Sequence, residues 1–239
     1  MSYTQHLLLF TILMAGCGTL PGHELGMPYH CVSPVPGGFG KTVQAPPYDP
    51  YELATGRLVT PKGTCSSVLI GKTLILTALH CADADYGIVE FPGGQKGAVV
   101  QWYVVGDDAA VGELVAGVEG IRPIPMGNPP DSSHRLVFLG YGHQKICLIP
   151  NGYHGDGYMQ GYGSGALQRG PIFSAKDFRY DTYHPKGWSI AWGDSGGPVI
   201  DLDTGKVVAI ASGVYVNGTG MNSRIEGIAW SRFYEYVIW

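Results

Sequence analysis

The segment 193–198, with the sequence Gly-Asp-Ser-Gly-Gly-Pro, combines one hydroxyl and one carboxylate with small or ring-locked residues. Glycines allow unusual backbone angles and close backbone approach, so such a turn can expose the Ser195 hydroxyl while amide groups point at a reacting oxygen. A serine nucleophile also needs an imidazole to accept its proton and a carboxylate to orient that imidazole. His80 has the most suggestive setting for the base, because the apolar run 74–76 leads to it and Cys81 follows it directly. A plain glycine-rich loop and a packed core histidine are the alternative interpretations of these two features taken singly.

The composition indicates a globular protein with many tight turns. The chain has 239 residues, including 37 glycines and 17 prolines, and is long enough for one domain of two sub-structures or for two small domains. Its formal net charge is −4, and it contains only 15 lysines and arginines. A nucleic-acid-binding surface needs a basic face, so we expect no nucleic-acid partner.

The N-terminal residues predict export. The apolar run 7–16 is too short to span a bilayer and suits the core of a signal peptide. It ends at Cys17, and Met-Ala-Gly-Cys at 14–17 resembles the lipobox of bacterial lipoproteins, in which the cysteine is acylated. We therefore interpret residues 1–17 as a signal peptide and lipobox, and expect the protein in the cell envelope, lipid-anchored, or secreted. An ordinary cleaved signal peptide and a misplaced start codon remain alternatives.

The remainder of the chain shows the pattern of a β-protein. Residues 18–52 are rich in proline and glycine without sustained periodicity, which is typical of a leader or tether. From about residue 53, short apolar or alternating runs follow one another between turn signals, and this spacing predicts a β-barrel or sandwich. One helix is expected at the C-terminus, where apolar residues recur at roughly helical spacing over 230–237.

Two specific motifs resemble those of trypsin-like (chymotrypsin-fold, S1 family) serine proteases. Thr-Ala-Leu-His-Cys at 77–81 resembles their TAAHC motif, and residues 193–198 are identical to their GDSGGP motif. The family order of His, Asp and Ser requires a carboxylate between the two, and residues 108–114 resemble its D-x-A-[LV]-x-x-L segment. Weaker landmarks follow in register at 121–124, 140–142 and 232–239.

The resemblance covers about residues 55–239 and implies the fold. We expect an all-β protein of two six-stranded antiparallel β-barrels, packed with the active site between them and followed by a short C-terminal helix. The protease domain would occupy residues 53–239, with barrel one over about 53–125 and barrel two over about 132–239.

The resemblance also implies an activity and the roles of the site residues. The protein would be a serine endopeptidase acting on protein or peptide substrates, without cofactor or metal, and we expect a monomer. Ser195 would attack the scissile carbonyl, His80 would act as general base and then general acid, and Asp108 would orient His80. The N–H groups of Gly193 and Ser195 would form the oxyanion hole. Asp107 is the alternative acid, because Asp-Asp-Ala at 107–109 also fits the D-x-A pattern.

Five cysteines are present, an odd number for an exported protein. Acylation of Cys17 would leave four. Within the resemblance, Cys65–Cys81 matches the family disulfide beside the catalytic histidine. The remaining pair, Cys31–Cys147, would tie the leader to the second barrel.

Asp194 requires a positively charged partner if it is buried. Animal members of the family pair this aspartate with an N-terminus created by cleavage, but the leader contains no comparable activation site. An unpaired buried carboxylate would be costly, so an internal cation is expected, and Arg135 is the candidate.

The specificity residues follow from the same resemblance. Ser189, six residues before the nucleophile, would lie at the base of the S1 pocket, and Ser212 and Val214 would line its wall. Because a carboxylate at the base would select a cationic side chain, Ser189 argues against cleavage after arginine or lysine. Val214 would narrow the pocket, which favours small or medium apolar P1 residues.

Two other interpretations fit parts of the sequence. Imidazoles and a carboxylate in glycine-rich loops could suggest metal ligands, but their irregular spacing favours solvated loop residues: His143, His154, His184 and Asp156. A catalytically silent binding protein on the same fold is the alternative function, since fold does not determine function.

Overall fold

The computed structural model describes residues 30–32, 41–43, 46–82, 86–142, 145–150, 157–162, 166–170, 172–175, 193–217 and 220–227. Only the backbone is described over 30–32, 41–42, 145–150, 157–162, 213–217 and 220–227. The predicted signal peptide with Cys17, the pocket residue Ser189 and the predicted helix over 230–237 lie outside the described residues. In the part of the chain that is described, no helix has the length and hydropathy needed to cross a membrane.

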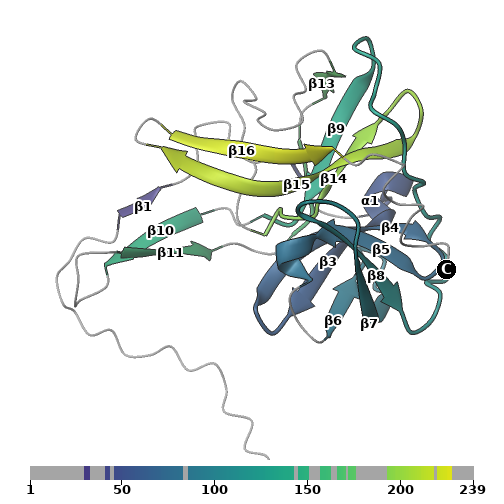
Figure 1. The fold of residues 1–239 in the computed structure, drawn as a ribbon, viewed down its shortest axis with the longest axis horizontal. Coiled ribbons are helices and arrows are strands. Elements are labelled where there is room, and N and C mark those ends of the chain that lie inside the picture. Colours follow the sequence, from purple (N-terminus) through teal and green to yellow (C-terminus); the bar gives the residue numbers. More distant parts are fainter. Residues whose placement is uncertain are drawn as a thin grey trace, which may run out of the picture.

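Six antiparallel strands close into a barrel in the first half of the chain (Figure 1). They are β3 (Thr55–Thr60), β4 (Gly63–Gly71), β5 (Leu74–Ala78), β6 (Gly87–Glu90), β7 (Lys96–Val104) and β8 (Ala109–Leu114). The order around the barrel is β3-β4-β5-β8-β7-β6. Closure leaves no unpaired strand edge, so this half presents a rigid rim from which side chains can project.

The second half contains a seven-stranded sheet of order β16-β15-β14-β9-β12-β2, with β13 also pairing with β9. Its strands are β2 (Lys41–Thr42), β9 (Arg135–Gly140), β12 (Gln168–Arg169), β13 (Phe173–Ser174), β14 (Pro198–Asp201), β15 (Lys206–Asn217) and β16 (Gly220–Gly227). The predicted all-β class and its division into two halves are confirmed. The described strands of the second half form this sheet beside the closed barrel of the first half, an arrangement consistent with the predicted two-barrel fold.

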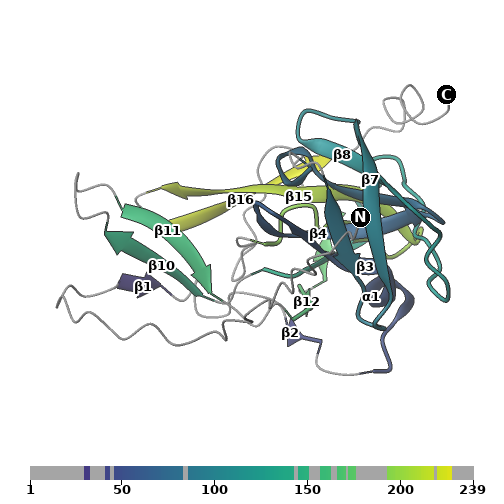
Figure 2. The same ribbon diagram turned by 90° about the horizontal axis from the view of Figure 1, so that it is seen from below.

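A separate three-stranded sheet lies to one side (Figure 2). It contains β1 (His30–Val32), β10 (Lys145–Pro150) and β11 (Gly157–Tyr162). The antiparallel register of β1 and β10 places Cys31 directly opposite Cys147. The disulfide between them stays a prediction.

The predicted leader contributes structure where it is described. Strand β2 pairs with β12, and the Val43 N–H donates to the Leu167 carbonyl at 2.8 Å. A short helix follows, α1 (Pro50–Ala54), which lies beside β3 in Figure 2. Hydrogen bonds therefore attach residues 41–43 of the predicted leader to the second sheet, whereas a free tether would make no such bonds.

A capping box explains why α1 forms. The Asp49 side chain accepts from the Glu52 N–H at 2.9 Å, and the Glu52 side chain accepts from the Asp49 N–H at 2.9 Å. Asp at the N-cap, Pro50 at the first helical position and Glu three residues after the cap form a recognised helix-start signature. Arg169 of β12 forms ion pairs with both carboxylates, so the helix is also tied to the second sheet.

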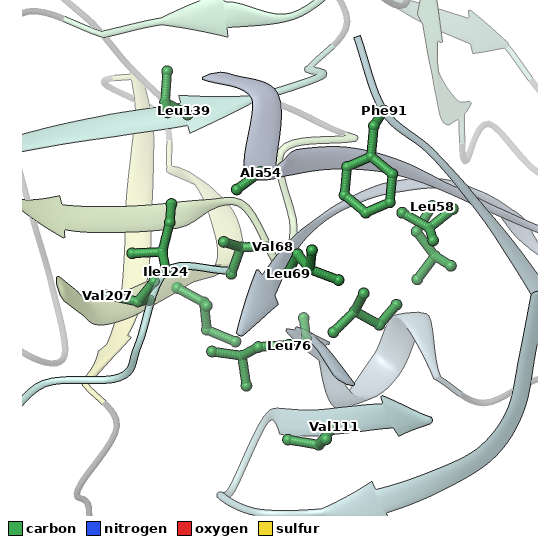
Figure 3. Close-up of a cluster of buried hydrophobic side chains, with 14 of the residues drawn as sticks. Ala54, Leu58, Val68, Leu69, Leu76, Phe91, Val111, Ile124, Leu139 and Val207 are labelled. Atoms are coloured by element: carbon green, nitrogen blue, oxygen red, sulfur yellow. The ribbon is translucent and has the colours of Figure 1, made fainter. Parts of the chain in front are cut away.

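One hydrophobic core joins the two halves. Barrel residues such as Leu58, Leu69 and Leu76 are fully buried, and Leu139 of β9 and Val207 of β15 belong to the same cluster (Figure 3). Strand β9 is buried on both faces, because its alternate residues Leu136 and Phe138 belong to a second, smaller cluster. The apolar packing therefore holds the barrel against the sheet, and it fixes the loops between them.

Candidate active site

The pairing of β5 with β8 brings His80 and Asp108 together. Ala78, the last residue of β5, lies opposite Ala109, the first residue of β8. The chain then enters a single 3-10 turn, η1 (Leu79–Cys81), and the Leu79 N–H donates to the Asp108 carbonyl at 3.1 Å. The two side chains are 28 positions apart in sequence, yet they are adjacent at the barrel rim because antiparallel strands end side by side.

The Asp108 carboxylate is positioned to orient the His80 ring. Nδ1 of His80 lies 2.9 Å from Oδ1 and 3.0 Å from Oδ2 of Asp108. The His80 backbone N–H also donates to Oδ1 at 3.1 Å, and the Ser212 hydroxyl donates to Oδ2 at 2.6 Å. Since a carboxylate only accepts, Nδ1 carries the hydrogen and Nε2 of the neutral ring is left as the proton acceptor.

The same contacts determine the charge of Asp108. Partial burial raises the pKa of this carboxyl group, while the hydrogen bonds from the His80 ring, the Ser212 hydroxyl and the His80 N–H lower it by more, so the net pKa is below its usual value. The group is therefore ionised at neutral pH. Its contribution to folding stability is present above the unfolded-state pKa and is lost as the pH falls through the lowered one.

Ser195 lies on a tight turn that begins at Gly193 and leads into β14. The Gly197 N–H donates to the Asp194 carbonyl at 2.7 Å, and the Gly196 N–H donates to the Ala211 carbonyl of β15 at 2.7 Å. Gly193 and Gly196 have φ angles of 95° and 82°, a region that side-chain-bearing residues rarely adopt. A Cβ atom on Gly196 would also clash with the Thr77 hydroxyl and the Ser66 carbonyl of the barrel. The turn is thus pressed directly against barrel one.

This contact brings Ser195 to the side of the barrel that carries His80. The Ser195 carbonyl accepts from the Ser66 N–H at 2.8 Å and lies 3.9 Å from Sγ of Cys81, the residue after His80. Within the described residues, no hydrogen bond joins the Ser195 hydroxyl to the His80 ring. Catalytic hydrogen bonds of substrate-free enzymes are often long and tighten when substrate binds.

Asp194 is buried, with an exposed fraction of 3%, and its carboxylate lies against the turn after β9. Oδ1 accepts from the Gly142 N–H at 2.7 Å. A Cβ atom on either Gly140 or Gly142 would overlap this carboxylate, so both glycines are needed for its close approach. The turn after β9 therefore forms part of the wall around Asp194.

The predicted pairing of Arg135 with Asp194 is wrong. Arg135 binds Asp203 instead, with Nη2 2.7 Å from Oδ1, and its side chain is 63% exposed. The reason is its place in β9: Arg135 begins this strand, whereas Asp194 packs where the strand ends, at Gly140. At roughly 3.3 Å per residue the two ends are about 17 Å apart, too far for an arginine side chain to span.

The structure contains the Cys65–Cys81 disulfide, with a Cα–Cα distance of 6.3 Å. It fastens the turn that carries His80 to β4. Cys65, His80 and Cys81 also bring three potential metal-ligand atoms together, but both sulfur atoms belong to the disulfide and cannot act as thiolate ligands.

The specificity residues are only partly described. Ser212 is 3% exposed, and its hydroxyl is bound to Asp108, a contact that the sequence analysis did not anticipate. The backbone of Val214 belongs to β15, and Ser189 lies outside the described residues. Asp107, the alternative acid, is exposed, and it is Asp108 that meets the His80 ring.

Ser66 is the polar residue of this region that the sequence analysis missed. Its hydroxyl bonds to both the serine turn and the turn after β9. A pair of serines directly before the apolar run 68–70 was the available signal, because polar residues inside a buried strand must have partners.

Comparison with solved structures places the fold among those of serine proteases. The chain is similar to a structure titled neuropsin, a serine protease expressed in the limbic system of mouse brain, with a TM-score of 0.56 and 16% identity. The similarity covers 79% of this chain and 95% of that one. At this identity it shows the shared fold alone.

A family model described as the trypsin-like peptidase domain matches residues 63–210, more than half of the chain. The chain therefore belongs to the trypsin-like peptidase family. Among curated proteins, no sequence matches significantly. Family and fold together support serine protease activity on protein or peptide substrates.

The packing of Asp194 against Gly142 gives a first prediction. Replacement of Gly142→Ala places a methyl group on the carboxylate, so we expect a loss of about 1–3 kcal/mol in the free energy of unfolding, as for other overpacked sites. Gly117→Ala is the matched control, because a Cβ atom there has no neighbour closer than 3.5 Å, and its effect should stay within about 0.5 kcal/mol. Equal stabilities in chemical denaturation would contradict the described packing of Asp194.

Proposed function

We propose that this protein is a serine endopeptidase that hydrolyses peptide bonds through an acyl-enzyme, with Ser195, His80 and Asp108 as its catalytic triad. The observation that carries the proposal is the His80–Asp108 contact at the barrel rim, next to which the glycine turn holds Ser195. Membership of the trypsin-like peptidase family supports the assignment of peptide-bond hydrolysis to this arrangement.

In the proposed mechanism, the Ser195 oxygen bonds to the scissile carbonyl carbon while its proton passes to Nε2 of His80. Asp108 stabilises the imidazolium cation and keeps Nδ1 protonated. The carbonyl oxygen becomes an oxyanion, which accepts hydrogen bonds from the N–H groups of Gly193 and Ser195. The C–N bond then breaks, and Nε2 returns its proton to the leaving amine. A water molecule then attacks the resulting ester while His80 accepts its proton. The bond between the acyl carbon and the Ser195 oxygen breaks, His80 returns the proton to Ser195, and the carboxylic acid product is released.

Labelling with a fluorophosphonate tests the nucleophile. We expect the folded wild-type protein to form one covalent adduct, located on Ser195 by mass spectrometry, because a serine activated by an imidazole reacts with such phosphorus electrophiles. Ser195→Ala is the control and should form none. A folded wild-type protein that does not react would favour the catalytically silent binding protein instead.

A pair of neighbouring variants tests the acid. Asp108→Asn places an amide against Nδ1, which favours the wrong tautomer of His80, and we expect kcat to fall by a factor on the order of 10⁴. Asp107→Asn makes the same chemical change at an exposed side chain one residue away, and it should leave kcat nearly unchanged. Steady-state hydrolysis of a peptide ester measures both. If the Asp107 variant suffers the large loss, the assignment of Asp108 is wrong.

We further propose a preference for small or medium apolar P1 residues. This rests on serine at position 189, where a carboxylate would select a cation, and on valine at position 214, which would narrow the pocket. A peptide-library cleavage profile should show enrichment of apolar residues directly before the cleaved bond. A dominant preference for arginine or lysine would refute this assignment of the pocket residues.

A further inference from the structure

Ser66 of β4 occupies an unusual position between the barrel and the serine turn. Its exposed fraction is 0%, and each of its polar atoms has a partner. The Ser66 hydroxyl lies 2.7 Å from the Gly193 carbonyl and 2.8 Å from the Tyr141 backbone nitrogen. Its own carbonyl accepts from the Thr77 hydroxyl at 2.8 Å, which anchors it to β5.

The directions of these hydrogen bonds follow from their chemistry. The Tyr141 N–H can only donate, so the Ser66 oxygen accepts from it. A hydroxyl has a single hydrogen, and the Gly193 carbonyl can only accept, so the Ser66 hydrogen is directed at Gly193. Both bonds are made inside the protein, where water cannot replace them and an unmade bond is costly.

The backbone of the same residue holds the other end of the turn. The Ser66 N–H donates to the Ser195 carbonyl at 2.8 Å. Ser66 thus binds the carbonyls of Gly193 and Ser195, the two residues whose N–H groups form the proposed oxyanion hole. Gly193, at a φ of 95°, has no side chain to restrict its backbone, so its orientation depends on such external contacts.

We infer that Ser66 is a positioning residue of the oxyanion hole: its hydroxyl fixes the backbone at Gly193 so that the two N–H donors converge on the reacting oxygen. This inference rests on the proposed function. Oxyanion-hole donors act on charge that develops only in the transition state. Loosening their geometry should therefore lower kcat and leave substrate binding nearly unchanged.

Ser66→Ala and Ser67→Ala provide a matched test. Ser67 is the next residue, is equally buried, and donates to the Gly56 carbonyl at 3.2 Å, away from the serine turn. For Ser66→Ala we expect kcat on a peptide ester to fall roughly ten- to hundredfold, less than the ~10²–10³ cost of deleting a donor outright. The KM should stay within about twofold of the wild-type value. Ser67→Ala should retain the wild-type kcat.

A spectroscopic measurement separates positioning from a general loss of structure. In the acyl-enzyme formed from an ester with an isotope-labelled carbonyl, weaker hydrogen bonding raises the infrared stretching frequency of the acyl carbonyl. We expect that increase in Ser66→Ala and not in Ser67→Ala. Ser66→Gly also removes the hydroxyl and leaves no methyl group in its place. It is used in both measurements if the Ser66→Ala protein does not fold.

The outcomes are distinguishable. A lower kcat with an unchanged KM and a higher carbonyl frequency, confined to the Ser66 variants, supports the inference. If the Ser66 and Ser67 variants behave alike while the wild type reacts with fluorophosphonate, the inference fails and the proposed function stands. A folded wild-type protein that does not react with fluorophosphonate overturns both.

Discussion

The buried carbonyl groups of the 193–197 turn need hydrogen-bond donors inside the protein, and the arrangement of the site depends on this constraint. Donors come from both halves. Ser66 of the barrel donates to the carbonyls of Gly193 and Ser195, and the Ala211 N–H of the second sheet donates to the Gly197 carbonyl. A turn of this kind cannot be satisfied by either half alone. The proposed nucleophile is therefore held at the junction of barrel and sheet.

The histidine and the aspartate depend on a different constraint, the closure of the barrel. In the register of β5 against β8, the end of β5 lies opposite the start of β8 at the barrel rim. His80, which follows β5, therefore meets Asp108, which precedes β8. The disulfide at Cys81 and the hydrogen bond from the Leu79 N–H to the Asp108 carbonyl then hold the short turn after β5, which carries His80, in place. The alignment of Asp108 with His80 is a consequence of strand pairing and needs no flexible loop.

Much of this arrangement could be read from local patterns. Short apolar runs predicted the strands, and two motifs predicted which histidine and serine to examine. The helix at 50–54 was also readable, because Asp49, Pro50 and Glu52 form a helix-start signature, but the surrounding prolines favoured the interpretation as a tether. Ser66 was harder to recognise, since a serine in a strand reveals nothing of its partners 75 and 127 positions away.

The sequence alone was enough to indicate the β-class and the residue types available for chemistry, because these follow from periodicity and short motifs. The Cys65–Cys81 disulfide was implied by the resemblance to trypsin-like proteases, and the structure contains it. Which charged and polar side chains bind one another was decided only by the tertiary structure. Arg135 and Asp194 looked compatible as charges, yet they lie at opposite ends of β9, and Arg135 binds Asp203 instead. The place of Ser212 in the pocket wall stays a prediction, and the hydrogen bond from its hydroxyl to Asp108 became visible only in the folded structure. Distances between residues far apart in sequence are decided by strand register and packing, which no local pattern specifies.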